Sequence, residues 1–301
     1  KFFKPIFATL ILLAAFWFIG WKDIAGSLEH IELGHVAFLV VLSMVMIWVS
    51  CVKWQLFIRA YGHEISIWRL MRLYIIGYFF NTFMPSFIGG DIARGYQLGG
   101  ELSNPQEGFI TTFLERLTGL WAMTLLGLLF VITGADATAG VELSIILLAV
   151  FVTIASVACF SERGGRLILD LLQRISKIIK IRSVEKGLSS VSPKVSKALA
   201  ACRSRPALIA HAMVLSVIFH SLTVVNTYVA ARAVGWHSAN FQGMFIVVPL
   251  VLIVSMIPLT PSGIGIQEGA FAYFMERIGA TQAQGFSIGV ILRLKVIIIA
   301  I

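Results

Sequence analysis

The sequence predicts an all-α, polytopic membrane protein with about six transmembrane helices and two inverted re-entrant helical hairpins. Two observations support this prediction: the composition, and a Pro/Gly-rich break that interrupts apolar sequence twice. Of the 301 residues, 58% are hydrophobic and 13% are charged, and the mean hydropathy is +0.90. This composition excludes a soluble single domain.

Six apolar stretches are long enough to cross a bilayer, which takes about 20 helical residues. They cover residues 5–21, 34–58, 108–132, 141–160, 207–231 and 282–301. The first stretch has no small-residue cleavage site after Trp21, so we expect it to stay as a membrane anchor. The sequence lacks the alternating segments of roughly 10 residues that build a transmembrane barrel.

Basic residues predict the orientation. Residues 161–206 hold eleven Lys and Arg against three acidic residues, and this segment carries most of the chain's net charge of +9. Loops rich in Lys and Arg stay in the cytoplasm, which explains the charge better than a nucleic-acid partner does. Apolar residues at helical spacing from Leu167 to Ile179 predict an amphipathic helix on an anionic membrane surface. We therefore expect a multi-pass protein of the inner (plasma) membrane with segment 161–206 in the cytoplasm.

Two breaks interrupt the apolar sequence, and each leads to a carboxylate. The first contains Asn81, Pro85, Gly89, Gly90, Asp91 and Arg94, and the second contains Pro258, Pro261, Gly263, Gly265 and Glu268. Backbone that leaves a helix at membrane depth must be buried in protein or line a polar cavity. Paired breaks in the two halves of a transporter mark its binding site. The alternative interpretation is two ordinary proline-kinked helices.

The charges on both sides of the first break predict a hairpin. Basic residues between positions 59 and 72, and the orientation of stretch 108–132, place both ends of this segment in the cytoplasm. The second break then enters from outside. We expect one domain, residues 1–301, with inverted-repeat halves of about 1–140 and 141–301.

Ionisable residues at membrane depth cost at least ~2.5 kcal/mol each, so each needs a partner, water or a function. The candidate substrate-binding residues are Asn81, Asp91, Arg94, Glu115, Arg116, Glu268 and Arg293, and Lys53 and Lys295 also interrupt apolar stretches. Arginine forks bind phosphate bidentately, and helix N-termini after Gly-rich turns offer N–H groups to anions. We expect the arginines to hold a phosphate and the carboxylates to balance charge or couple protons. Structural ion pairing is the alternative for each residue.

Enzyme motifs are missing. The sequence has no G-x-x-x-x-G-K-[ST] phosphate-binding loop and no G-x-S-x-G nucleophile elbow. Ile88 occupies the place of the first glycine in the G-x-G-D motif of intramembrane aspartyl proteases. His211, His220 and the three cysteines show no metal-ligand spacing. We expect no catalytic residues, no cofactor and no metal.

Taken in order, the residues of the two breaks together with Glu115, Arg116 and Arg293 resemble the lysylphosphatidylglycerol-synthase transmembrane-region family. This family includes the flippase-like half of the bacterial multiple peptide resistance factor and stand-alone relatives. The resemblance covers residues 40–295 and implies translocation of a lipid, such as an aminoacylated phosphatidylglycerol, between leaflets. No soluble aminoacyl-transferase domain follows within the 301 residues, so we expect no synthase activity from them.

The sequence therefore predicts a bacterial or archaeal inner-membrane lipid translocase. Its substrate would be an anionic or aminoacylated phospholipid, or a polyprenyl-phosphate-linked lipid. A homo-oligomer or a partner synthase is the expected assembly, and no nucleic acid is expected to bind. Two alternatives stay open: a membrane subunit of an aminoacyl- or glycosyl-transferase system, and a scaffold that transports nothing.

Overall fold

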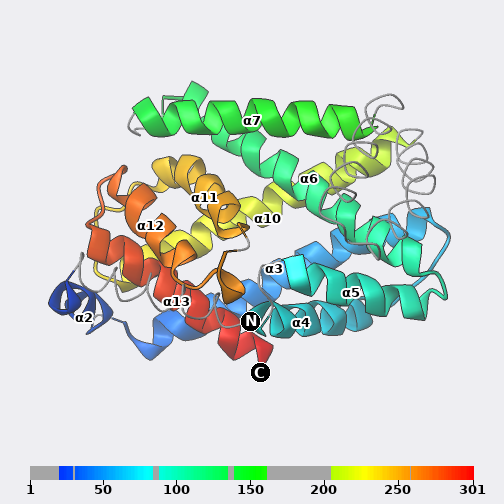
Figure 1. Ribbon diagram of the computed structural model, residues 1–301, viewed down its shortest axis with the longest axis horizontal. Coiled ribbons are helices and arrows are strands. Elements are labelled where there is room, and N and C mark those ends of the chain that lie inside the picture. Colours follow the sequence, from blue (N-terminus) through cyan, green and yellow to red (C-terminus); the bar gives the residue numbers. More distant parts are fainter. Residues whose placement is uncertain (1–19, 30, 84–87, 135–138, 161–204, 258) are drawn as a thin grey trace.

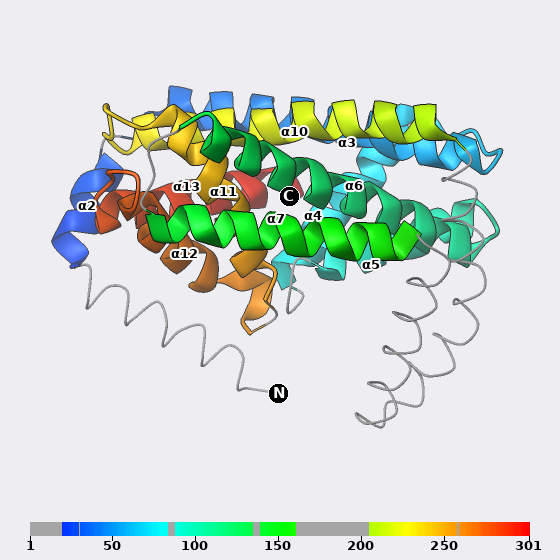
Figure 2. The same cartoon turned by 90° about the horizontal axis from the view of Figure 1, so that it is seen from above.

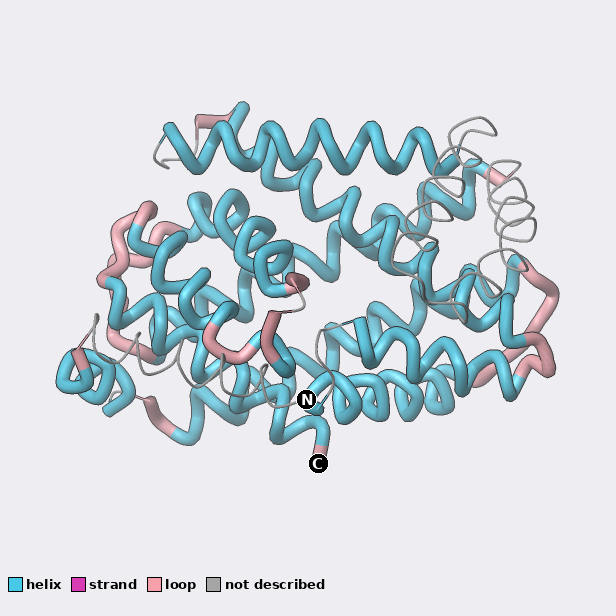
Figure 3. Tube along the Cα trace, viewed as in Figure 1, coloured by secondary structure: helices cyan, strands magenta, loops and turns pink. Residues whose placement is uncertain are grey.

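The structure is a computed structural model, and it describes residues 20–29, 31–83, 88–134, 139–160, 205–257 and 259–301. All regular structure in these residues is helical (Figures 1 and 3). The predicted anchor at 5–21 and the basic segment at 161–206 lie almost entirely outside the described residues. Pro85 and Pro258 also lie outside them.

Five of the helices follow predicted apolar stretches, and the others lie between these stretches. They are α2 (Trp21–Glu29), α3 (Leu33–Ala60), α4 (Ile67–Phe83), α5 (Ile88–Glu101), α6 (Pro105–Ile132), α7 (Ala139–Phe160), α10 (Pro206–Ala233), α11 (Phe241–Ser255), the short 3₁₀ turn η1 (Pro261–Gly263), α12 (Ile266–Glu276) and α13 (Gln282–Ala300). By length and composition, α3, α6, α10 and α13 can cross a membrane. The chain is thus a helical protein with at least these four candidate spans, and the count of six stays a prediction.

The long helices begin where the sequence sets a boundary. Pro105 and Pro206 occupy the first helical turn of α6 and α10, where proline's missing N–H costs nothing and its fixed φ suits the helix. Each of these helices has 28 residues, about 42 Å at 1.5 Å per residue. Each therefore exceeds the roughly 30 Å hydrocarbon core of a bilayer.

The α4–α5 pair starts and finishes at one end of the molecule. Arg69, near the start of α4, lies 3.7 Å from Glu101 at the end of α5, and His63 contacts Glu107 at 2.6 Å at the same end. Between these ends the two helices run side by side towards the middle of the molecule (Figure 1). The chain therefore makes a helical hairpin across the first break.

The α11–α12 pair starts and finishes at the opposite end. Gly243, in the first turn of α11, packs against Ile278, just beyond α12. The turn η1 of the second break packs against α4, the helix that precedes the first break, near the centre of the molecule (Figure 1). The two hairpins thus point towards each other from opposite ends; that they are inverted, re-entrant membrane hairpins stays a prediction.

Helix α11 is the centre of the largest apolar cluster. Met244, Ile246, Val247 and Val251 are fully buried, and they pack with side chains from α10, α12 and α13. A helix that is apolar on all sides is expected to be buried in this way. Helix α7 lies on the outside of this group along α6 (Figure 2), with Phe151 and Leu147 exposed on its outer face.

Glycines bring the hairpin helices into close contact. Gly90 of α5 lies against the backbone of Gly77 in α4, and Gly108 of α6 lies against Gly95 and Gly99 of α5. A Cβ atom at Gly90 or Gly108 would overlap backbone atoms of the neighbouring helix. Small residues at such contacts allow tight helix packing in membranes. Helix α5 is therefore held closely between α4 and α6.

Candidate functional site

The first break is stabilised by a side chain from the preceding helix. The Asn81 side-chain oxygen accepts a hydrogen bond from the Gly90 backbone N–H at 2.6 Å. This N–H lies in the first turn of α5, where backbone donors have no partner within their own helix. The sequence pattern predicts a backbone turn at Pro85, Gly89 and Gly90, but Gly89 and Gly90 lie in helix α5, which already begins at Ile88. Gly90 is needed there for its close approach to α4.

Five charged side chains form one network behind this break, and we call them the charged cluster: Lys53, Asp91, Arg94, Glu115 and Arg116. Arg116 donates to both Asp91 carboxylate oxygens at 2.8 Å. Arg94 contacts Asp91 at 3.0 Å and Glu115 at 2.6 Å. Lys53 contacts Glu115 at 3.0 Å. The cluster joins helices α3, α5 and α6.

Aromatic and hydroxyl side chains enclose the cluster. The Arg94 guanidinium lies 4.3 Å from the ring centre of Tyr74 and 5.0 Å from that of Trp54, distances at which cation–π attraction is significant. Ser50 donates to Glu115 at 3.0 Å, and the Tyr74 hydroxyl bonds Ser50 at 2.8 Å. These contacts hold the Arg94 and Glu115 side chains in defined positions.

Arg94 nevertheless retains unused hydrogen-bonding capacity. Its side chain is 1% exposed, yet its Nε and Nη1 atoms have no partner among the described residues. Buried polar groups are nearly always hydrogen-bonded, and an arginine has five N–H groups to satisfy. An unpaired, buried guanidinium edge is suited to donate hydrogen bonds to an oxygen ligand.

The cluster also has an excess of positive charge. It combines three cations with two carboxylates. Lys53 and Arg94 are buried with Glu115, whereas the side chains of Arg116 and Asp91 are 41% and 19% exposed. Uncompensated charge in a low-dielectric interior is costly. The arrangement is therefore suited to one added negative charge on the accessible Arg116 side.

A second ion pair lies at the second break. Arg293 of α13 donates from Nε to Glu268, which is in the first turn of α12. The other Glu268 oxygen accepts from the Gly265 backbone N–H at 2.7 Å. Arg293 also donates to the backbone carbonyls of Ser262 at 3.0 Å and Gly263 at 3.2 Å. This pair therefore holds the backbone of the break as well as its own charges.

The two breaks are built alike. In each half a long helix, a short helix, a break, a second short helix and a further helix follow one another: α3 to α6, and α10 to α13. Asp91 and Arg116 are 25 residues apart, and so are Glu268 and Arg293. Each pair joins the helix that follows the break to the next helix. The inverted repeat of the two halves stays a prediction.

The structure brings the predicted residues together in two groups. Asp91, Arg94, Glu115 and Arg116 share the charged cluster, while Glu268 and Arg293 pair at the second break. Within the described ranges no hydrogen bond or ion pair joins the groups, although α4 contacts η1 between them. A single cavity containing both groups stays a prediction.

Sequence reasoning missed several residues of the site. Lys53 interrupts an apolar stretch, which marks it in the sequence. Its partner Glu115 is 62 positions away, and sequence spacing does not predict a contact over that separation. Tyr74, Trp54 and Ser50 carry no sequence signal that separates them from core residues. Lys295 bonds the Asn226 side chain. Among the described residues no group of three or more His, Cys, Asp or Glu could hold a metal ion.

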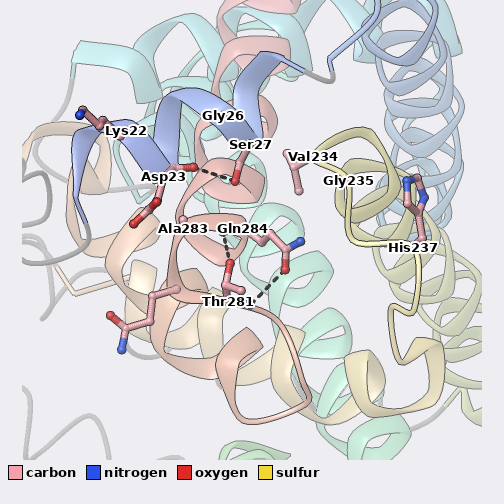
Figure 4. A pocket seen from close by; sticks show the side chains of 11 residues that line it. Lys22, Asp23, Gly26, Ser27, Val234, Gly235, His237, Thr281, Ala283 and Gln284 are labelled. Carbon is pink, nitrogen blue, oxygen red and sulfur yellow. Dashed lines mark hydrogen bonds between the residues drawn. The ribbon is translucent and has the colours of Figure 1, made fainter.

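A cavity of about 670 Å³ lies away from the charged cluster, between α2, the loop after α10 and the start of α13 (Figure 4). Asp23 and Thr281 line it on one side and His237 on the other. None of the predicted site residues lines this cavity.

Fold and site define a helical membrane protein with two opposed hairpins and a buried, cation-rich cluster behind the first of them. The family model described as "Lysylphosphatidylglycerol synthase TM region" matches residues 3–301, and the chain belongs to this family. The expected family resemblance is therefore confirmed.

Relatives come from archaea. A "UPF0104 membrane protein" of Archaeoglobus fulgidus is 24% identical over 264 residues, covering 84% of this chain and 79% of the relative. Two "UPF0104 membrane proteins" of Methanothermobacter thermautotrophicus are 21% identical (96% of this chain, 89% of the relative) and 23% identical (93% and 85%). No solved structure matches the chain significantly.

Proposed function

We propose that this protein is a lipid translocase that moves an anionic phospholipid, or a polyprenyl-phosphate-linked lipid, between membrane leaflets. The observation that carries the proposal is Arg94: a fully buried arginine with two unpaired nitrogens in a cluster with one excess positive charge. A lipid phosphodiester bears one negative charge and accepts hydrogen bonds from guanidinium groups. It would neutralise the excess positive charge of the cluster and accept hydrogen bonds from the unpaired Arg94 nitrogens.

The position of the cluster supports this proposal. Asp91 of the cluster lies in the first turn of α5, directly after the first break, and α4, the helix before this break, contacts η1 of the second break. Midplane sites between broken helices are typical of transporters. We propose that both hairpins re-enter the plasma membrane and that segment 161–206 faces the cytoplasm. Lipid would reach Arg116 first, because Arg94 lies deeper.

Transport can be tested with purified protein in vesicles that contain a fluorescent phosphatidylglycerol, whose outer-leaflet share is read by a membrane-impermeant quencher. The matched substrate control is a fluorescent phosphatidylcholine, whose headgroup is zwitterionic. We expect faster exchange of the anionic lipid. Vesicles that exchange neither lipid faster than protein-free vesicles do would contradict the proposal, and a co-purifying soluble enzyme would then favour the transferase-subunit alternative.

Arg116→Gln is the variant that tests the site. Losing one charge-assisted contact costs about 1.5–3 kcal/mol, which is roughly a ten- to hundredfold loss of lipid binding. The melting temperature should change little, because Asp91 keeps its contact with Arg94. Arg69→Gln is the control, because the Arg69 side chain is 64% exposed and its contact with Glu101 is long, at 3.7 Å.

A further inference from the structure

The backbone of the second break has an unusual conformation. Ser262, Gly263 and Gly265 have φ values of 53°, 65° and 81°, in the left-handed region that non-glycine residues rarely adopt. Ser262 is a non-glycine residue held in this conformation, and it is buried. A strained backbone of this kind persists only where its surroundings fix it.

Arg293 supplies these surroundings. Its Nη1 donates to the Ser262 carbonyl at 3.0 Å and to the Ser262 hydroxyl at 3.3 Å, and its Nη2 donates to the Gly263 carbonyl and to Gln267, each at 3.2 Å. Nε is engaged by Glu268. All three guanidinium nitrogens are therefore bonded inside the protein. Carbonyls released from a helix in a membrane need such partners.

Glu268 is the negatively charged partner of Arg293, and it also binds the backbone of the break. One of its oxygens binds Arg293, and the other accepts the Gly265 N–H at 2.7 Å. The pair thus supplies donors to two freed carbonyls and an acceptor to one freed N–H. Glu268 is 2% exposed and the Arg293 side chain is 16% exposed.

The counterpart pair at the first break shares the bond from arginine Nε to a carboxylate but differs in its other partners. Arg116 donates from Nε and Nη2 to Asp91. No backbone carbonyl among the described residues accepts a hydrogen bond from Arg116. Its side chain is 41% exposed. The backbone N–H of the first break is instead held by Asn81. Two pairs with the same 25-residue spacing therefore have different partners.

We propose that Glu268 and Arg293 are positioning residues: they fix the second break in its bent form against α4, and Arg293 does not bind the anionic headgroup. The inference assigns a division of roles within the proposed translocase and rests on it only for the transport readout. Arg116, the residue at the matching position, is the one that exchanges its carboxylate partner for the ligand.

Arg293→Lys tests this assignment, because lysine keeps the charge but loses the planar fork that reaches five acceptor atoms on four residues. We would place a cysteine at Ile264, within the break, in a background free of native cysteines, and follow its labelling by a membrane-impermeant maleimide. Loss of one or more charged hydrogen bonds should increase the labelling rate about tenfold or more. Arg277→Lys is the matched control, since Arg277 is exposed and stacks over Tyr273.

Transport kinetics distinguish a residue that positions the backbone from one that binds the lipid. Arg293→Lys should lower the maximal rate of anionic lipid exchange while leaving the lipid fraction at half-maximal rate unchanged. Arg116→Lys should raise that fraction instead. An Arg293→Lys protein that labels like wild type, or that raises the half-saturating lipid fraction as Arg116→Lys does, would overturn the assignment. If even the wild type exchanges no lipid, the proposed function fails, and the labelling rates alone decide the positioning role.

Discussion

Glu115 is the residue whose neutralisation should harm the protein most. It accepts from Lys53 at 3.0 Å and from Arg94 at 2.6 Å in a buried setting. Glu115→Gln keeps the shape but leaves three cations facing Asp91 alone. Removing one partner of a buried pair costs about 3–5 kcal/mol, a large share of the 5–15 kcal/mol that typically separates folded from unfolded protein. We expect a large fall in melting temperature.

The charge count predicts a much smaller loss of stability when Lys53 is neutralised. Lys53→Met removes the excess cation, while Glu115 keeps Arg94 as its partner. We therefore expect Lys53→Met to destabilise the protein much less than Glu115→Gln does. Combining the two changes restores the wild-type balance of one excess cation. The double variant should recover about 1–3 kcal/mol relative to the sum of the single losses, the usual range for residues in one network.

These three variants can be compared by unfolding in detergent micelles, followed by tryptophan fluorescence. The same proteins test the proposed function, because anion binding should fall in Lys53→Met and return in the double variant, whose net cluster charge matches the wild type. A double variant whose loss simply equals the sum of the single losses would refute the charge reasoning. So would a Glu115→Gln protein as stable as the wild type.

Three further predictions concern other parts of the molecule. Gly90→Ala should destabilise by about 1–3 kcal/mol through overpacking against α4, whereas Gly100→Ala in the same helix, where a Cβ meets nothing within 4 Å, should be neutral or stabilising in a melting experiment. Cysteines replacing His63 and Glu101 should both be labelled from the cytoplasm only; labelling of just one from outside would replace the hairpin by a single crossing. Lys295→Met should leave the melting temperature equal or higher, because Lys295 is buried and no ion pair with a carboxylate is found for it within the described ranges; a clear drop would show that its bond to the neighbouring amide is stabilising.

The hydropathy pattern was sufficient to locate the helices. The stretches 34–58, 108–132 and 207–231 correspond to α3, α6 and α10 within a few residues, because the bilayer requires about 20 apolar residues and the prolines at 105 and 206 fix two of the starts. The breaks could be located for a related reason: proline and glycine in apolar sequence are costly unless their backbone groups find other partners.

The partners of the charged residues could not be predicted. Asp91 and Arg94 are three residues apart, a spacing that puts two residues of one helix on the same face, and they contact each other at 3.0 Å. However, the sequence gives no rotation or crossing angle for α3 and α6, so it could not bring Lys53 to Glu115. The sequence pattern also predicts the same phosphate-binding role for Arg116 and Arg293. Their difference depends on which carbonyls lie within reach, and only the folded backbone determines that.

The glycine contacts around α5 have a mechanical consequence. Since the backbones of α4, α5 and α6 touch at Gly77, Gly90, Gly95 and Gly108, none of these helices can slide or rotate against its neighbour without steric overlap. Tightly packed interfaces move as rigid bodies, and hinges form where few contacts cross. The three helices should therefore move as a single unit that carries Asp91, Arg94, Glu115 and Arg116 with their geometry intact. A conformational cycle would then move the boundaries of this unit, among them the boundary with the α11–α12 hairpin, where α4 meets η1 and α6 meets α11.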